Sequence, residues 1–381
     1  MEYVTEYCKT GNTIKLRKIS PEIRETILKS IPHTLKKYVD NDNIYRNRAI
    51  EMMDILTKPE FDEEDCTGVL KGLTWTGNSC YLDSVLVCLF AVKSNFIDEY
   101  ILNSKLKKRS GTLLDCMEDS DDEKIDLKNR KEIQNELKNI YDNMKNGKRQ
   151  KCLKLRKYFK NCRGGQLFYG SRMAESGEFL TFIFNIFDTN VAVKKTITYG
   201  TNNVSINPDK DLIKTSEITD NSASMVHFIP SDIVRLLSTR VYYELRSFLT
   251  IRDDSGELAP ENQYKDDNGN SYKRRISYNT IIDTPYLVFR IDRLWLNKFF
   301  QTKIIPSQII TLQNLKQFAL SSIVVFRRMH YTCYFRCGKN WYYYDDTDDN
   351  IELIGSYNKM LNIKTFPNVI TNGTVYFYTK M

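Results

Sequence analysis

Residues 72–84 of the chain read Gly72-Leu73-Thr74-Trp75-Thr76-Gly77-Asn78-Ser79-Cys80-Tyr81-Leu82-Asp83-Ser84. The Gly-Asn-Ser run predicts a turn, because these residue types favour the backbone conformations that turns require. Either Asn78 or Ser79 could then cap a helix that begins near Cys80. Apolar residues continue that helix at the spacing of one buried face: Leu82, Val85, Leu86 and Leu89.

This position favours Cys80 as a nucleophile. The N-terminus of a helix presents backbone N–H groups without helical partners and a positive potential, and both stabilise a thiolate. The same N–H groups can bind the oxyanion that forms when a thiolate attacks a carbonyl. Cys80 is therefore the best candidate among the nine cysteines, and Cys88 is interpreted as a packing residue. Position alone leaves open the alternative that Cys80 is an inert buried thiol.

A base for this thiolate has few candidates, because the chain contains only three histidines. Residues 330–346 (HYTCYFRCGKNWYYYDD) predict a hairpin of two aromatic strands joined by a turn at 337–340. The hairpin would bring Asp345 beside His330, where a carboxylate can hold the imidazole in the correct tautomer. The other two histidines have no acidic hairpin partner and are interpreted as structural: His33 and His227.

The segment around Cys80 resembles the cysteine box of ubiquitin-specific proteases, whose common form is G-L-x-N-x-G-N-T-C-Y-M-N-S-x-L-Q-C-L. Its sequence, N-S-C-Y-L-D-S-x-L-x-C-L-F-A, is more similar still to the corresponding segment of the cylindromatosis-type deubiquitinase. The segment from His330 resembles the family's histidine box, H-Y-x-x-Y-x-R followed by W-Y-x-F-D-D. The resemblance implies an α+β, papain-like fold with a helical thumb, a β palm and reduced fingers. It also implies a catalytic triad of Cys80, His330 and Asp345.

One departure from the family concerns the oxyanion. Most members carry an Asn five residues before the nucleophile, and this chain has Trp75 there. The cylindromatosis branch also lacks that Asn, so we expect Asn78 and the backbone N–H of Cys80 to act as donors instead. The simpler interpretation of Asn78 is a turn or helix-cap residue. The resemblance further implies that Asp346 supports the oxyanion or a bound water.

The resemblance also implies substrate contacts. Tyr331 would line the slot for a Gly-Gly tail, and Glu178 and Phe179 lie in a segment similar to the family's Q-D-A-x-E-F-L helix. Without the resemblance, Phe179 is simply part of the core face of a helix. The C-x-x-C pairs of zinc-bearing fingers and the zinc B-box are both missing from the sequence, so we expect no metal and no cofactor.

Composition bounds the remaining possibilities. The chain has 381 residues, a net charge of +8 and no apolar run of the ~20 residues that a membrane span needs. An odd number of cysteines without a C-x-x-C pair argues against a disulfide framework and favours a cytoplasmic protein. The abundance of Lys, Asn, Ile and Tyr indicates an AT-rich genome, such as that of a large DNA virus; the compartment would then be the host cytoplasm.

Charge and predicted secondary structure change along the chain. Residues 1–65 predict a helical extension, and residues 66–381 predict the catalytic domain, with helices first and strands later. Residues 115–126 carry seven acids, whereas residues 145–163 carry nine Lys/Arg and no acid. Such runs are usually solvated helix faces that partly neutralise one another; the alternative is a partner-binding patch.

These observations predict a thiol-dependent deubiquitinase. It would hydrolyse the bond after the C-terminal Gly-Gly of ubiquitin and bind ubiquitinated proteins or polyubiquitin, but not nucleic acid or membranes. Two alternatives remain open: a catalytically inactive ubiquitin-binding module, which the Trp75 departure motivates, and a protease for a ubiquitin-like modifier.

Overall fold

The computed structural model describes most of the chain after residue 70. The described residues are 25, 71–92, 96–108, 120–160, 162, 164–189, 286–295, 298–312, 316–348 and 351–381, and short strand segments between 193 and 280. The expected helical extension, residues 1–65, lies outside them except for position 25, as does the expected domain boundary at residue 66.

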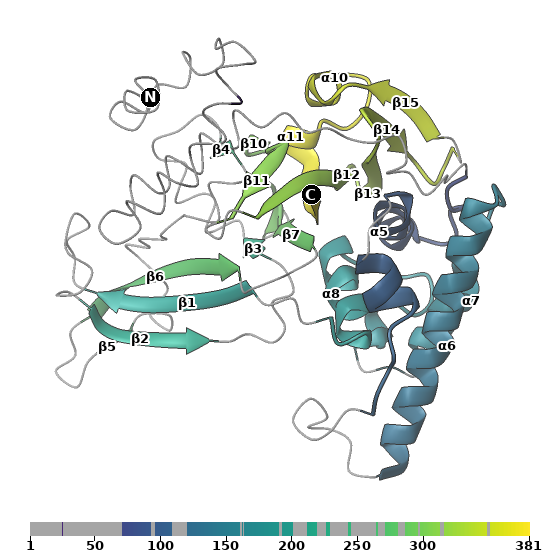
Figure 1. Cartoon of the computed structure of the whole chain (residues 1–381), viewed down its shortest axis with the longest axis horizontal. Helices are drawn as coiled ribbons and strands as arrows, with labels where there is room; N and C mark the ends of the chain where they lie inside the picture. The colour runs from purple at the N-terminus through teal and green to yellow at the C-terminus, as the bar shows by residue number, and fades with distance from the viewer. Residues whose placement is uncertain are drawn as a thin grey trace.

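The first half of the described chain is helical, as its sequence predicts. Six helical segments follow one another, drawn in blue and teal in Figure 1: α5 (Cys80–Ala91), the π-helix η2 (Ile97–Leu102), α6 (Ser120–Lys145), α7 (Leu153–Phe159), the 3₁₀ turn η3 (Gly165–Leu167) and α8 (Ser176–Ile186). Helix α5 is buried along its whole length, and its residues are apolar except for Asp83 and Ser84. This burial fixes the position of the cysteine at its first turn.

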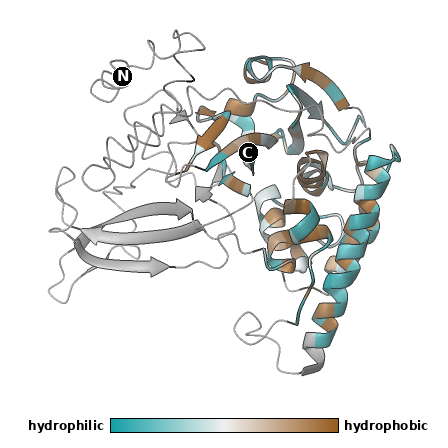
Figure 2. Cartoon of the chain, viewed as in Figure 1, coloured by the Kyte–Doolittle hydropathy of each residue, from teal (hydrophilic) through white to brown (hydrophobic). Residues whose placement is uncertain are grey.

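The long helix α6 is the amphipathic counterpart of α5. Its hydrophilic surface is plain in Figure 2, where α5 is mostly brown and α6 mostly teal. A stripe of four apolar side chains at helical spacing faces the core: Ile133, Leu137, Ile140 and Met144. Helix α6 therefore forms an outer wall of the helical part rather than its centre.

The second half of the described chain forms an eight-stranded sheet. Seven of its strands lie in the order β15-β14-β13-β12-β16-β7-β3, and β11 pairs with β12. Their bounds are β3 Val226–Phe228, β7 Tyr286–Ile291, β11 Ile309–Thr311, β12 Gln317–Arg327, β13 His330–Cys337, β14 Asn340–Tyr344, β15 Ile351–Gly355 and β16 Gly373–Lys380. All neighbours are antiparallel except β3 and β7.

Alternating residues of β12 divide the core between the two faces of the sheet. Val324 and Phe326 pack into the cluster formed with the helices, whereas Ile323 and Val325 pack into a second cluster on the opposite face. The short helices α10 (Tyr357–Leu361) and α11 (Val369–Asn372) cover this second face. The Ser322 hydroxyl donates to the carbonyl of Cys88, which fastens α5 to the sheet.

A separate antiparallel ribbon extends away from the main sheet in Figure 1. Its strand order is β2-β1-β6-β5, with bounds β1 Val193–Gly200, β2 Leu212–Ile218, β5 Tyr264–Lys265 and β6 Ser271–Thr280. Two short pairs complete the described strands: β10 (Ile304–Ile305) with β4 (Tyr243–Glu244), and β8 (Leu294–Trp295) with β9 (Lys298–Phe299). An isolated bridge joins Leu73 to Gln150. Helices followed by antiparallel strands confirm the expected α+β class.

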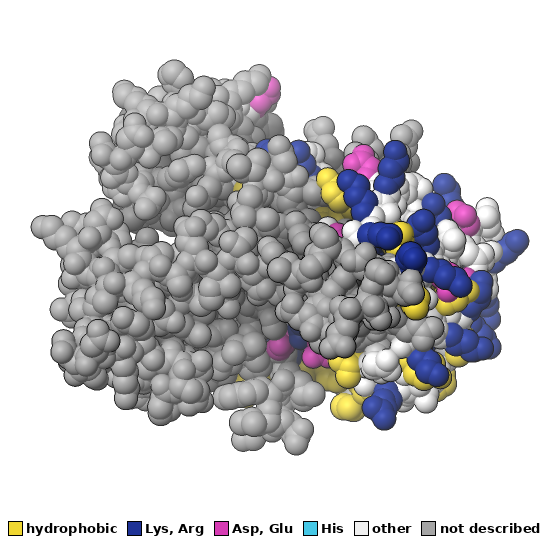
Figure 3. All heavy atoms as spheres, turned by 90° about the horizontal axis from the view of Figure 1, so that it is seen from below, with side chains coloured by type: hydrophobic (Ala, Val, Ile, Leu, Met, Phe, Trp, Pro, Cys, Tyr) yellow, Lys and Arg dark blue, Asp and Glu magenta, His cyan; other side chains and the backbone are white. Residues whose placement is uncertain are grey.

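The basic run at 145–163 is largely a surface feature. Lys and Arg side chains gather over the helical part of the face in Figure 3, and Lys148, Arg149 and Lys151 are exposed. Lys154 pairs with the buried Glu136 of α6 at 2.6 Å, so part of the run is neutralised by its neighbouring helix. Arg156 is the exception, because its side chain is buried.

Two further expectations concern membranes and cysteines. None of the helices in the described part of the chain has the length and hydropathy of a bilayer span. Five described cysteines are free thiols: Cys80, Cys88, Cys152, Cys162 and Cys333. Cys337 is disulfide-bonded, which the argument against a disulfide framework did not anticipate for this residue.

Candidate active site

Cys80 is the first residue of α5, as the sequence predicts. Helix α5 begins after Ser79, and the Ser79 carbonyl accepts from the backbone N–H groups of Leu82 and Asp83. The N–H groups of the first helical residues have no acceptor within the helix, so they point toward the nucleophile end of the site. The Ser79 hydroxyl does not cap the helix; it accepts from the Thr76 N–H at 2.8 Å and donates to the Asp83 carboxylate.

The turn before Cys80 is held from α7. Gly77 and Asn78 have φ of 50° and 59°, a left-handed conformation that Gly and Asn tolerate better than other residues. The guanidinium of Arg156 donates to the carbonyls of Thr76 and Gly77 at 2.8 and 2.9 Å. A buried Arg therefore fixes the two carbonyls that direct the chain into the nucleophile helix.

The segment upstream of this turn is fixed by the sheet. The Tyr344 hydroxyl donates to the Leu73 carbonyl at 2.5 Å, and the Trp75 N–H donates to the Asp346 carbonyl at 3.2 Å. Gly72 lies so close to the Tyr344 ring that an added Cβ would come within 2.0 Å of it. Glycine is thus required here by close approach rather than by its backbone angles.

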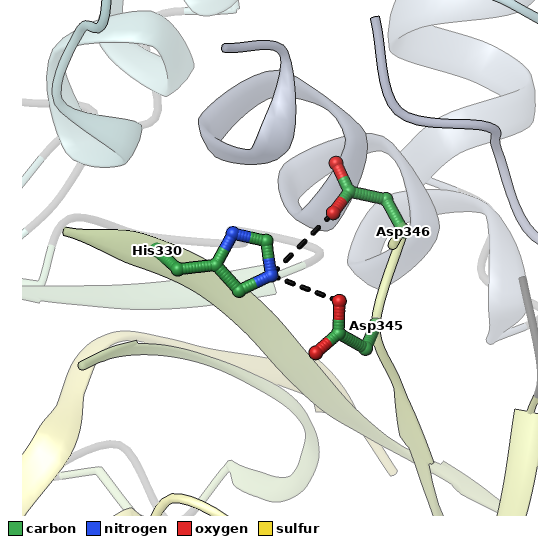
Figure 4. A group of neighbouring side chains, drawn as sticks. All are labelled: His330, Asp345 and Asp346. Carbon is green, nitrogen blue, oxygen red and sulfur yellow. Dashed lines mark hydrogen bonds and ion pairs between the residues drawn. The ribbon is translucent and has the colours of Figure 1, made fainter. Parts of the chain in front are cut away.

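His330 and Asp345 come together through the predicted hairpin. His330 is the first residue of β13, and β13 pairs with β14 in a regular register from Cys333 opposite Tyr344 to Cys337 opposite Asn340. This brings His330 Nε2 within 2.8 Å of Asp345 Oδ1 (Figure 4). The same carboxylate oxygen accepts from the Thr347 N–H and hydroxyl at 3.0 and 2.7 Å, which fixes its orientation.

The electrostatics of this pair favour an imidazolium. A hydrogen bond to Asp345, and next a hydrogen bond to Cys80, raise the pKa of His330 from 6.5 to about 10. Burial raises the pKa of Asp345, but hydrogen bonds from His330 and Thr347 outweigh it and hold that pKa below its ordinary value. His330 thus interacts with both Asp345 and Cys80, the contacts that a thiolate–imidazolium pair requires.

Asp346 lies at the same site but is more deeply buried. Its Oδ1 is 3.5 Å from His330 Nε2, and Figure 4 shows both carboxylates on one side of the imidazole. Single ligand atoms of His330, Asp345 and Asp346 lie within 4.8 Å of one another, a spacing that a metal ion could bridge. The direct hydrogen bond between His330 and Asp345 satisfies those two groups without an ion.

The chain is similar to proteins of a known family. A family model described as ubiquitin carboxyl-terminal hydrolase matches residues 71–378. The chain belongs to the ubiquitin carboxyl-terminal hydrolase family. It is accordingly a cysteine-type ubiquitin hydrolase, which the sequence motifs had predicted.

A solved structure supports the fold of this hydrolase. It is a SAGA DUB module of Ubp8, Sgf11, Sus1 and Sgf73 bound to monoubiquitin, with a TM-score of 0.52 and 16% sequence identity. The match covers 90% of this chain and 76% of that one. At such low identity the likeness concerns the fold, and it confirms the expected papain-like α+β class. No curated protein sequence matches the chain.

The expected oxyanion donors in this hydrolase have mixed outcomes. The Asn78 amide donates to the Ser171 carbonyl at 2.9 Å, so one of its two N–H groups is already engaged in holding the turn. Trp75 is 44% exposed and contributes only its backbone N–H to the site. The backbone N–H of Cys80 at the start of α5 keeps the position that the sequence predicts for an oxyanion donor.

The expected substrate contacts differ from one another. Glu178 is exposed on the first turn of α8, where a substrate can reach it. Phe179 is fully buried among Tyr81, Phe159 and Phe168, so its assignment as a substrate contact is wrong and it serves the core. The simpler interpretation of that helix face therefore applies to this residue.

Tyr331 is also mostly buried. Its ring packs against Phe326, with ring centroids 4.6 Å apart, and its hydroxyl bonds to Ser176 at the start of α8. With only 5% of its surface exposed, Tyr331 joins β13 to α8, and any contact with a substrate tail is restricted to that small area.

Sequence reasoning missed the residues that join the two sides of the site. Glu175 caps α8 by accepting from the N–H groups of Gly177 and Glu178, and it pairs with Arg290 of β7 at 2.9 Å. Arg156 and Asp83 were likewise missed. An Arg in a basic run and an acid in a helix motif both predict exposed positions, and only the fold reveals that they are buried.

Proposed function

We propose that the protein is a deubiquitinase that uses Cys80 as nucleophile, His330 as base and Asp345 as the group that orients the base. The contact of one imidazole with both Cys80 and Asp345 carries the proposal, because Cys80 and the His330–Asp345 hairpin come from distant parts of the sequence. The position of Cys80 at the first turn of a buried helix supports it further.

The proposed reaction follows that of a thiol protease. His330 holds the proton of Cys80, and the thiolate attacks the carbonyl after the C-terminal Gly-Gly of ubiquitin, forming a C–S bond. The backbone N–H groups at the start of α5 stabilise the oxyanion. As the C–N bond breaks, His330 gives its proton to the departing lysine amine. His330 then takes a proton from water, which attacks the thioester and frees Cys80.

The proposed partners are ubiquitin, ubiquitinated proteins and polyubiquitin chains. The sequence of the Cys80 segment is similar to that of the cylindromatosis-type enzyme, and this similarity supports extended polyubiquitin chains, including linear ones, as substrates. We propose residues 66–381 as the catalytic domain and the cytoplasm as its compartment, which would be the host cytoplasm if the gene is viral. The proposal includes no cofactor, no nucleic acid and no membrane.

The test is reaction with ubiquitin that carries an electrophile at its C-terminus. The wild-type protein is expected to form one covalent adduct, which peptide mass spectrometry places on Cys80. Cys80→Ala abolishes the adduct, whereas Cys162→Ala, which removes a buried free thiol elsewhere, retains it. An adduct on another cysteine, or none with the folded wild type, contradicts the proposal.

One observation favours a second candidate, a catalytically inactive ubiquitin-binding module. Trp75 replaces the Asn of the common motif and offers only its backbone to the site. Such a module would bind ubiquitin without hydrolysing it in the wild type. Hydrolysis of a ubiquitin fluorogenic reporter that Cys80→Ala eliminates rejects it. Parallel reporters built on ubiquitin-like modifiers decide whether ubiquitin or one of these is the substrate.

A further inference from the structure

Two carboxyl groups with no role in the proposed reaction meet beneath the active site. Asp83 lies one turn after Cys80 on α5 and is fully buried, and Asp346 follows β14 and is 2% exposed. Asp83 Oδ1 and both carboxylate oxygens of Asp346 are buried without a hydrogen-bond partner. Buried polar atoms are almost always paired, so three such oxygens in one cluster need an explanation.

A proton supplies that explanation. An ionised carboxylate only accepts hydrogen bonds, so two ionised groups facing each other cannot pair, whereas a protonated one donates to the other. Burial, with a smaller contribution from the facing Asp83, raises the pKa of Asp346 to about 10. Burial also raises the pKa of Asp83 to about 6, although hydrogen bonds from Ser79, Asp346 and Cys152 oppose the shift. One proton therefore remains on the pair at neutral pH.

The groups around the pair come from every element packed against it. Ser79 precedes α5, which contributes Cys80 and Tyr81, and Cys152 precedes α7, which contributes Arg156. The hairpin contributes His330, Cys333, Tyr344 and Asp345. Arg156 is the only cation among them that stays charged throughout, and its Nη2 atom has no hydrogen-bond partner. A pair with one negative charge is balanced by Arg156, and a doubly charged pair is not.

We propose that Asp83 is a positioning residue that shares one proton with Asp346 and thereby joins the nucleophile helix to the end of the histidine hairpin. Asp346 has the higher pKa of the two and holds the shared proton, so the carboxyl group 3.5 Å from His330 Nε2 is neutral and the single negative charge of the pair lies on Asp83. Asp345 then remains the main negative charge that favours the imidazolium of His330. The catalytic consequence rests on the proposed function; the shared proton does not. Asp83 touches no substrate and acts through Asp346 and His330.

The first experiment uses the unmodified protein. Carbon-13 NMR of aspartate carboxyl groups follows each titration, and Asp83→Asn and Asp346→Asn identify the two signals. We expect one group to titrate near pH 6 and the other near pH 10, far from the ordinary value of about 4. Two groups that both titrate near pH 4 would overturn the shared proton, whether or not the protein reacts with ubiquitin.

The second experiment tests the positioning role in Asp83→Asn, whose amide donates to Asp346 without a shared proton. Asn is also the residue that the common motif quoted above carries three positions after the cysteine. The readout is the rate of iodoacetamide alkylation at Cys80 against pH, measured by mass spectrometry. Without a facing carboxylate Asp346 ionises more easily, so we expect the acid limb to move down by about one pH unit.

Asp142→Asn is the matched control, since it makes the same chemical change at an exposed position of α6. In this control the acid limb of the Cys80 alkylation profile should not move. A rate that falls equally at every pH in Asp83→Asn would show a structural role only and refute the positioning role.

Thermal unfolding gives an independent readout. Raised folded-state pKa values destabilise the wild type as pH rises above about 4, so Asp83→Asn should lose less Tm between about pH 5 and pH 8.

Discussion

The acid-bearing hairpin and the nucleophile loop meet at one site but are built in opposite ways. The hairpin places His330 beside Asp345 through a regular ladder between neighbouring strands, so one continuous segment carries the geometry. The loop before Cys80 is held instead by side chains far along the chain, from Arg156 and Tyr344. Local pairing makes the hairpin robust, whereas the nucleophile position depends on distant residues.

The largest effect is expected from Asp345→Asn, which breaks the hairpin side. By analogy with other triads, loss of the orienting carboxylate should lower kcat/KM for a ubiquitin reporter by about 10²–10⁴. Because Asp345 is the main cause of the raised pKa of His330, the alkaline limb should also move to lower pH. A kcat/KM profile between about pH 5 and pH 10 measures both.

Stability provides the control for that variant. Because the pKa of Asp345 is lowered in the fold, its ionised carboxylate stabilises the protein above about pH 4, and this stabilisation is lost as pH falls. Because the pKa of His330 is raised, its protonated ring stabilises the protein below about pH 6.5, and this stabilisation is lost as pH rises toward 10. The Tm deficit of Asp345→Asn should therefore be greatest between these values. A deficit that grows toward pH 10 would contradict this assignment.

Arg156→Met tests the loop side. Two carbonyls would lose their donors and Asp83 its nearby cation, which we expect to cost about 2–4 kcal/mol of unfolding free energy. Displacement of Cys80 should lower kcat/KM by about 10–100-fold. Urea unfolding and reporter hydrolysis measure the two effects. Lys157→Met, an exposed neighbour on α7, is the control and should change neither.

Gly72→Ala tests the same loop through packing alone. The new Cβ would lie 2.0 Å from the Tyr344 ring, so we expect a loss of about 1–3 kcal/mol as the two segments separate. Thermal or urea unfolding measures it. We also expect Gly72→Ala to lower the reactivity of Cys80, because the segment before the nucleophile is displaced. Adding Tyr344→Leu should recover part of that reactivity, since the smaller side chain relieves the clash. If it recovers none, the clash with Tyr344 is not the cause of the loss.

The smallest effect sharpens the comparison by excluding a residue from the site. Phe179→Leu should lower stability by about 1–1.5 kcal/mol, because a buried ring is replaced by a smaller apolar side chain. The KM for ubiquitin substrates should stay unchanged, whereas the exposed Glu178→Gln should raise it if that acid contacts the substrate. A raised KM in Phe179→Leu without loss of stability would restore its assignment as a substrate contact.

The same contrast explains how much the sequence predicts. The order of helices and strands, the first turn of α5 and the His330–Asp345 hairpin are local patterns, and the structure contains them. The roles of Arg156 and Asp83 depend on burial that arises only when α7 packs against the turn before α5. Phe179 was misassigned for the same reason: a helix pattern predicts an apolar face but does not determine whether that face meets a ligand or the core.

The order of strands has a consequence for synthesis on the ribosome. Strand β16, residues 373–380, lies between β12 and β7, although both of those strands precede it in the chain. Until these residues leave the exit tunnel, β12 and β7 have no shared neighbour and the middle of the sheet is incomplete. A nascent chain therefore completes the sheet that carries His330 only when almost all of the described sequence has been translated.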